Sequence, residues 1–337
     1  MVRPPEPYTP AMGSDPAGLV DITRDLLKAY TLTRRLTERY RSGALRFEEL
    51  TALVGDSEAS LLYRLKERCH ALFRPDEGSG SEAVRPEALF DLAVGSLFHE
   101  AMKLRENLYQ REVYGPKVRA VRGIAGASGG DAVRDRLVRE MEKILAAAAQ
   151  RLDEAVHETE TLLTQTRDQF RILLAEHREN GLVCRYLVEN ASLVGEVFEE
   201  GFDTLLGEIY GEPSEAYALV ARSYLCSGYF VEGRRALAEA IGIAGHRPDL
   251  DRLVAYADGM SAYLEGRYAA ALEGLSHWLD ARPPEPEGIY ADLALAAASR
   301  MAQLAEGAEA ASIAADAETL AKRIEPYSPR AARPPSA

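Results

Sequence analysis

The stretch that decides the fold is Ser214–Pro283, which reads SEAYALVARSYLCSGYFVEGRRALAEAIGIAGHRPDL (214–250) and then DRLVAYADGMSAYLEGRYAAALEGLSHWLDARP (251–283). Each part holds small and apolar residues at helical spacing, then a glycine, then a second helical run. Gly228 and Gly266 stand at the breaks, where a turn with positive φ favours glycine. Pro283 ends the second part, because proline cannot continue a helix. The stretch therefore predicts two consecutive helical hairpins.

These hairpins resemble tetratricopeptide repeats, which are about 34 residues long and need small side chains where their two helices cross. Small residues stand at such positions, Ala221 and Gly233 in the first hairpin and Gly259 and Ala271 in the second. The resemblance covers about residues 214–324. The last hairpin in that range keeps only a turn glycine, as expected for a unit that caps the stack.

The resemblance implies a concave groove lined by the first helix of each hairpin. The residues that we expect to bind a partner there are Arg222, Leu225, Tyr256, Met260, Tyr263 and Leu264. Apolar and aromatic side chains with one arginine favour an amphipathic helix or an extended apolar peptide as the partner. The alternative is that N-terminal helices cover these side chains, which would make the repeats a packing element.

Charge and cysteine content limit the other possibilities. The chain has 337 residues, a net charge of −13 and a pI near 5.1, which disfavours a general binder of nucleic acid or anionic membrane. Three distant cysteines form no disulfide framework or paired metal motif. No signal peptide or long apolar run is visible, so we expect a cytoplasmic protein without a membrane segment.

Nearly every segment has helical periodicity and none alternates like a strand, which predicts an all-α protein. The expected parts are a disordered tail (1–17), an N-terminal helical domain (18–122), a long helix with a helical hairpin (131–212), a tetratricopeptide-like domain (213–325) and a second disordered tail (326–337). The long helix has apolar residues at three-four spacing, interrupted by threonine and glutamine. Such a seam favours packing within the chain, with a homodimer through the long helix as a further possibility.

Residues 46–73 offer a competing interpretation, because a short helix, a glycine turn and a second helix resemble a helix-turn-helix. Its second helix would enter the major groove of DNA. The side chains that would face the bases are Ser57, Ser60, Tyr63 and Arg64, with nearby arginines such as Arg34, Arg39 and Arg41 available to phosphates. The alternative is that residues 46–73 have only a structural role, because two short helices joined at a glycine occur in many all-α domains.

Motifs for catalysis or metal binding are incomplete. His99-Glu100 lacks the second histidine of a zinc-protease motif, because Lys103 stands in its place. Glu154 and His157 form one Glu-x-x-His pair, whereas a di-iron bundle needs two such pairs. We therefore expect no enzyme, no metal and no cofactor. The first hypothesis is an adaptor or assembly subunit that binds another protein, and the alternative is a DNA-binding transcriptional regulator with a helical effector domain.

Overall fold

The structure is a computed structural model that describes residues 16–73, 85–127, 132–281, 288–304 and 310–329. These residues form helices and no strand, so the predicted all-α class is confirmed. The elements are α1 (Pro16–Arg41), α2 (Phe47–Leu50), α3 (Leu61–Leu72), α4 (Pro86–Tyr109), the π-helical turn η1 (Gln110–Tyr114), α5 (Gly115–Ala127), α6 (Ala132–Glu176), α7 (Gly181–Glu189), α8 (Ala191–Phe198), α9 (Phe202–Tyr210), α10 (Pro213–Cys226), α11 (Phe230–Ala244), α12 (Pro248–Leu264), α13 (Tyr268–Asp280), α14 (Gly288–Leu304), α15 (Ala310–Ile324) and the 3₁₀ turn η2 (Glu325–Tyr327).

Contacts between the helices divide the chain into two compact units. The N-terminal unit comprises residues 14–178 and 190–202, and the C-terminal unit comprises residues 179–189 and 203–337. The borders differ from the expected ones. The long helix α6 packs with the N-terminal helices α4 and α1, whereas α7 packs on α10.

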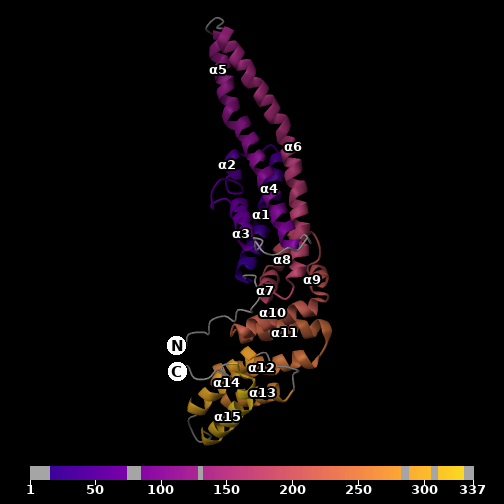
Figure 1. The fold of residues 1–337 in the computed structure, drawn as a ribbon, viewed down its shortest axis with the longest axis vertical. Coiled ribbons are helices and arrows are strands. Elements are labelled where there is room, and N and C mark those ends of the chain that lie inside the picture. The colour runs from indigo at the N-terminus through magenta and orange to yellow at the C-terminus, as the bar shows by residue number, and fades with distance from the viewer. Residues whose placement is uncertain (1–15, 74–84, 128–131, 282–287, 305–309, 330–337) are drawn as a thin grey trace. The chain divides into compact units, whose positions relative to one another are not determined.

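In the N-terminal unit, α4, η1 and α5 run one after another alongside α6 (Figure 1). The predicted long helix is present as α6, and residues 132–176 contain no proline or glycine that would end it. The two arms form a long hairpin, and α1 and α3 pack beside its lower part. The expected packing of the long helix within the chain is therefore observed.

The C-terminal unit contains three helical hairpins, α10 with α11, α12 with α13, and α14 with α15. The two predicted turn glycines have positive φ angles, +80° at Gly228 and +76° at Gly266. A close backbone crossing joins α12 and α13, since a Cβ atom on Gly274 would lie 2.8 Å from the Cα atom of Gly259. Small residues are therefore required where these two helices meet.

The expected tails need correction where the structure describes them. Residues 16–17 belong to α1, and η2 follows α15 directly. Ser328 is buried, and its hydroxyl donates a hydrogen bond to Asp292 on α14. The other residues of both tails lie outside the described part of the chain, as does Pro283.

Candidate functional site

The centre of the predicted groove is filled. Tyr256 on α12 is 0% exposed, and its ring centroid lies 4.9 Å from that of Tyr290 on α14 and 5.3 Å from that of Trp278 on α13. Leu225 and Met260 are buried as well. The expectation that these three side chains line an open groove is therefore corrected. Tyr256 is covered by Trp278 of α13 and Tyr290 of α14, which form an aromatic cluster with it between neighbouring hairpins.

The other three predicted residues are more accessible. Leu264, at the end of α12, is 67% exposed. Tyr263 is half-buried, and its ring centroid lies 6.4 Å from that of Tyr268; burial, followed by this neighbour, raises the pKa of Tyr263. Arg222 is half-buried on α10. The predicted set is thus divided between the interior of the unit and its surface, and it forms no continuous lining.

The helix-turn-helix stretch is arranged differently from a DNA-reading surface. The first helix, α2, has only four residues, and α3 packs on both α1 and α4. Ser60 is buried and donates its hydroxyl hydrogen to the carbonyl of Thr51 at 3.0 Å. Tyr63 packs edge-on against Phe98, with ring centroids 6.1 Å apart. Of the four expected base-reading residues, Ser57 is exposed.

Arg64 has an internal partner. Its Nε atom donates to Oδ2 of Asp25 at 3.0 Å and its Nη2 atom to Oδ1 at 3.3 Å. Arg68 donates to the same Asp25 carboxylate at 2.6 Å, and that carboxylate is buried. The hydrogen bond to Asp25 raises the pKa of Arg64. The guanidinium therefore neutralises a buried charge between α1 and α3, which would otherwise be costly.

The arginines expected at phosphates are paired too. Arg34 lies 3.1 Å from Glu199, Arg39 lies 3.0 Å from Glu49, and Arg41 lies 2.6 Å from Glu160, measured between nitrogen and oxygen atoms. Because each cation has a carboxylate beside it, this surface presents less free positive charge than the sequence indicates.

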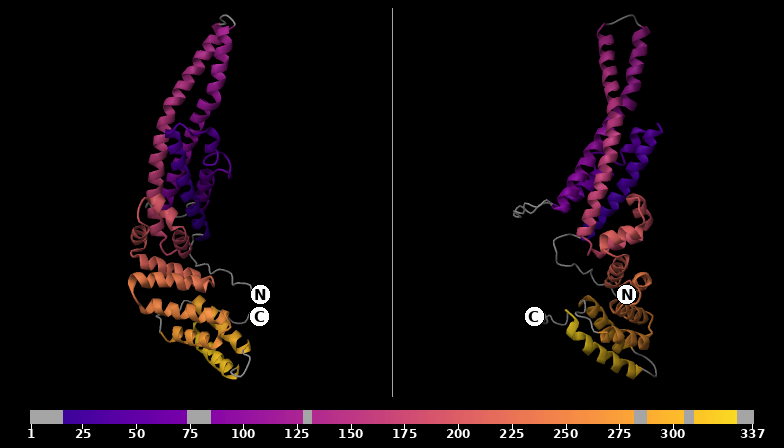
Figure 2. Two further views of the ribbon diagram at one scale, coloured as in Figure 1. Left: turned by 180° about the vertical axis from the view of Figure 1, so that it is seen from behind. Right: turned by 90° about the vertical axis from the view of Figure 1, so that its right-hand side faces the viewer.

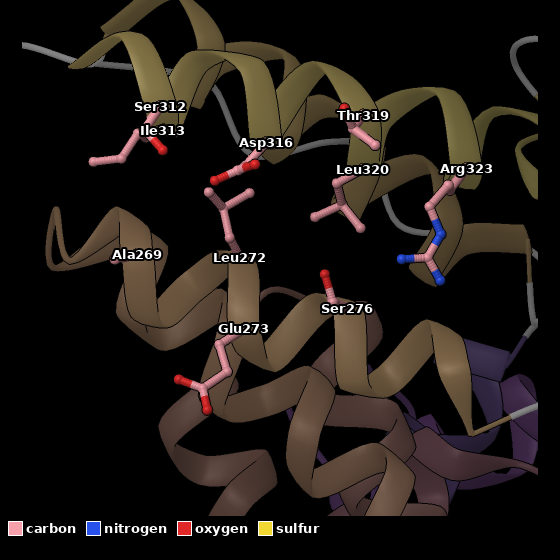
Figure 3. A pocket seen from close by; sticks show the side chains of 10 residues that line it. All are labelled: Ala269, Leu272, Glu273, Ser276, Ser312, Ile313, Asp316, Thr319, Leu320 and Arg323. Carbon is pink, nitrogen blue, oxygen red and sulfur yellow. The ribbon is translucent and has the colours of Figure 1, made fainter. Parts of the chain in front are cut away.

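An open groove does exist in the C-terminal unit, between α13 and α15 (Figure 3). It has a volume of about 650 Å³ and is lined by Ala269, Leu272, Glu273, Ser276, Ser312, Ile313, Asp316, Thr319, Leu320 and Arg323. We call it the α13/α15 groove. Leu272 and Leu320 are buried side chains that form its floor, whereas Glu273 and Asp316 are exposed at its sides.

The charge of the α13/α15 groove is negative. Arg323 is its only cation among the lining residues, and that guanidinium donates to Asp280 at the end of α13. Glu273 lies on α13 and Asp316 on the facing helix α15. Since Arg323 is paired with Asp280, no second cationic lining residue neutralises these two carboxylates. A segment with apolar and basic side chains would complement such a surface.

Sequence reasoning missed this groove. Ile313, Asp316, Leu320 and Arg323 follow helical spacing, so a common face of α15 could have been recognised. The sequence pattern predicts only a capping role for the last hairpin. The position of α15 against α13 depends on packing between hairpins, which the helical pattern alone does not specify.

A second hollow, of about 600 Å³, lies in the N-terminal unit between α2 and α4. Its lining residues are Phe47, His99, Met102, Lys103, Arg105, Glu106 and Tyr109. The Arg105 guanidinium lies 5.5 Å from the ring centroid of Phe47, and Lys103 is paired with Glu100 at 2.7 Å. Both charge signs are therefore present, and neither dominates this hollow.

Among the described residues, we looked for side chains placed to bind a metal or to act as nucleophiles. These residues contain no group of three or more His, Cys, Asp or Glu placed to hold a metal, and Glu154 and His157 are exposed on α6. Burial raises the pKa of Cys184 to about 12 and the pKa of Cys69 well above its ordinary value. Both thiols are therefore protonated at neutral pH and are poor nucleophiles.

Comparisons of the chain with protein-family models, with curated proteins and with solved structures find no match. Among the helices that the structure describes, none combines the length and the apolar character needed to cross a membrane.

Proposed function

We propose that this chain is an adaptor or assembly subunit that binds another protein through its C-terminal hairpins, which we interpret as tetratricopeptide-type repeats. The observation that carries the proposal is the α13/α15 groove, an open surface with an apolar floor and carboxylates on both sides. The partner segment would be amphipathic, with apolar side chains for the floor and Lys or Arg for the sides.

The two parts of the groove have different roles in this proposal. Contact with Leu272 and Leu320 removes apolar surface of the partner from water and supplies affinity. Glu273 and Asp316 attract the basic side chains, which sets the orientation of the segment and raises the association rate. Binding is therefore expected to weaken as salt increases.

The proposal is tested with a fluorescent amphipathic helical peptide of leucine and lysine, titrated with the full chain and followed by anisotropy. Replacing both carboxylates, Glu273→Gln with Asp316→Asn, is expected to weaken binding about tenfold, because each exposed charge contributes roughly 0.5–1 kcal/mol. Ser276→Trp, which fills the groove with a large side chain, is expected to abolish binding.

The matched control is Glu232→Gln with Glu239→Gln, two exposed carboxylates on α11 that change the net charge by the same amount. This control is expected to bind the peptide within about twofold of the unaltered chain, since those sites contribute no more than general charge attraction. Equal weakening by the control and by the groove variant would show nonspecific attraction to an acidic protein and would contradict the proposal.

A further inference from the structure

In the N-terminal unit, α5 and the N-terminal part of α6 extend beyond α1 and α3 as a helical hairpin (Figure 1 and Figure 2), and the contacts of α5 are mainly with α6 and η1. We call residues 115–127 and 132–148 the tip hairpin. Val118 and Val138 are buried in its seam. Leu137 and Ile144 on the same stretch of α6 are 58% and 57% exposed. Two helices are too thin to bury all of the apolar side chains that this stretch carries.

The exposed apolar side chains lie on one flank of the tip hairpin. Leu137 and Ile144 are seven residues apart, which is two helical turns, so they point the same way. The opposite flank is marked by the ion pair of Arg122 with Glu142, whose atoms lie 2.7 Å apart. Tyr114, the last residue of η1, stands four residues before the buried Val118, and Arg122 stands four residues after it, so the two flank the seam on opposite sides. Tyr114 is 40% exposed.

The tip hairpin is basic within an acidic protein. Its two ranges contain seven Lys or Arg and three Asp or Glu, a net charge of +4, against −13 for the whole chain. Lys117 lies beside the apolar flank, with its Nζ atom 6.0 Å from the ring centroid of Tyr114. Lys143 is paired with Glu140 at 3.0 Å, so it contributes less free charge than Lys117. The flank is thus both apolar and cationic.

Residues 203–337 have the opposite character, with twelve Lys or Arg against twenty Asp or Glu. Their α13/α15 groove is apolar at its floor and acidic at its sides. The sizes also correspond. The groove runs along α15 from Ser312 to Arg323, about 16 Å, and the distance from Leu137 to Ile144 is about 10 Å along α6. The flank therefore fits the groove in charge, apolar character and length.

We propose that the tip hairpin of one copy of this chain occupies the α13/α15 groove of a second copy. Leu137 and Ile144 contact the floor formed by Leu272 and Leu320, and Lys117 lies near the acidic sides. This rests on the proposed function of the groove and names its occupant. Because the two surfaces differ, the contact is heterologous, and repeated copies form either a closed ring or an open chain.

The test uses the full chain and two double variants in sedimentation experiments over a range of concentrations. The tip variant is Leu137→Glu with Ile144→Glu, and the groove variant is Glu273→Lys with Asp316→Lys. All four side chains are exposed, so circular dichroism is expected to show unchanged helix content. The unaltered chain is expected to self-associate, and each variant alone is expected to be a monomer.

A mixture of the two variants is the decisive sample. The groove variant keeps an intact tip and the tip variant keeps an intact groove, so together they are expected to form a 1:1 dimer and nothing larger. A control variant, Leu92→Glu with Ile172→Glu, changes two exposed apolar residues elsewhere in the N-terminal unit and is expected to associate like the unaltered chain. Added salt is expected to weaken the association several-fold, because the surfaces have opposite charges.

Two outcomes would overturn the proposal. If the groove variant associates as well as the unaltered chain and salt strengthens the association, the tip hairpins pair with each other instead. If the unaltered chain is monomeric at every concentration, no second copy occupies the groove. In that second case the leucine-lysine peptide still tests the groove separately, so a failure of this inference is distinguishable from a failure of the proposed function.

Discussion

The upper half of α6 (residues 132–148, in the tip hairpin) and its lower half (residues 149–176) have different neighbouring helices. In the lower half, Leu152, Val156 and Phe170 are buried, with Phe170 between Phe90 of α4 and Phe198 of α8 at ring-centroid distances of 5.6 and 6.3 Å. In the upper half, Leu137 and Ile144 are largely exposed. Both halves have apolar residues at helical spacing. The number of helices packed around each half therefore decides which apolar side chains become core.

The seam of α6 also contains polar residues, and two of those in the lower half are buried. Thr159 and Thr166 are buried in the lower half, and their hydroxyls donate to carbonyls one turn earlier, of Ala155 at 2.6 Å and Leu162 at 2.7 Å. Their hydrogen-bonding groups are therefore satisfied within the helix. This is why a seam with threonines can pack against α4 without a polar partner from another chain.

The largest effect on stability is expected for Phe170→Ala, which would create a cavity where α4, α6 and α8 meet. We expect the free energy of unfolding to fall by about 3–5 kcal/mol, measured by urea denaturation with helix content as the signal. Ile144→Ala in the upper half is the matched comparison, and it is expected to change that free energy by less than about 0.5 kcal/mol. Similar losses in the two variants would show that both halves are equally buried in solution.

A smaller and local effect is expected for Val138→Ala, in the seam of the tip hairpin. Removing two carbon atoms from this buried side chain costs about 1–2 kcal/mol. Because α5 contacts mainly α6 and η1, the destabilisation is expected to stay local and to appear as faster amide hydrogen exchange in α5 and residues 132–148. Global urea unfolding should change little. Slower exchange at the tip than in the lower half would contradict the comparison.

The smallest effect is expected where the two halves meet. Tyr40, near the end of α1, donates its hydroxyl hydrogen to Asp153 at 2.5 Å. Burial and this hydrogen bond raise the pKa of Tyr40 from 10.0 to about 12. A raised pKa in the folded state favours the protonated phenol, so the stabilisation is complete below pH 10 and is lost as the pH rises from 10 to 12.

Tyr40→Phe removes that hydrogen bond and is expected to lower the free energy of unfolding by about 1 kcal/mol at neutral pH. The difference between the variant and the unaltered chain should shrink as the pH approaches 12. Urea denaturation at several pH values measures it, and tyrosinate absorbance checks the titration. A difference that stays constant over this pH range would show that Tyr40 acts through packing rather than through its hydroxyl group.

Local features of the fold followed from the sequence. The helices and the positive φ angles at Gly228 and Gly266 depend on residues near one another in the chain, and the close crossing at Gly259 joins two consecutive helices. Helical periodicity and the missing side chain of glycine operate over a few residues. Contacts between residues far apart in the sequence could not be predicted from these local patterns. Asp25 and Arg64 belong to separate helices, and nothing in their spacing indicates an ion pair.

The sequence by itself determined that the chain is all-α, that its C-terminal part forms helical hairpins and that one helix is unusually long. Only the tertiary structure decided which side chains are accessible. Tyr256 is enclosed by aromatic rings from α11, α13 and α14, whereas the open groove lies between α13 and α15. The physical reason is that a helical pattern defines which residues share a face, and the packing of neighbouring helices defines whether that face meets protein or water.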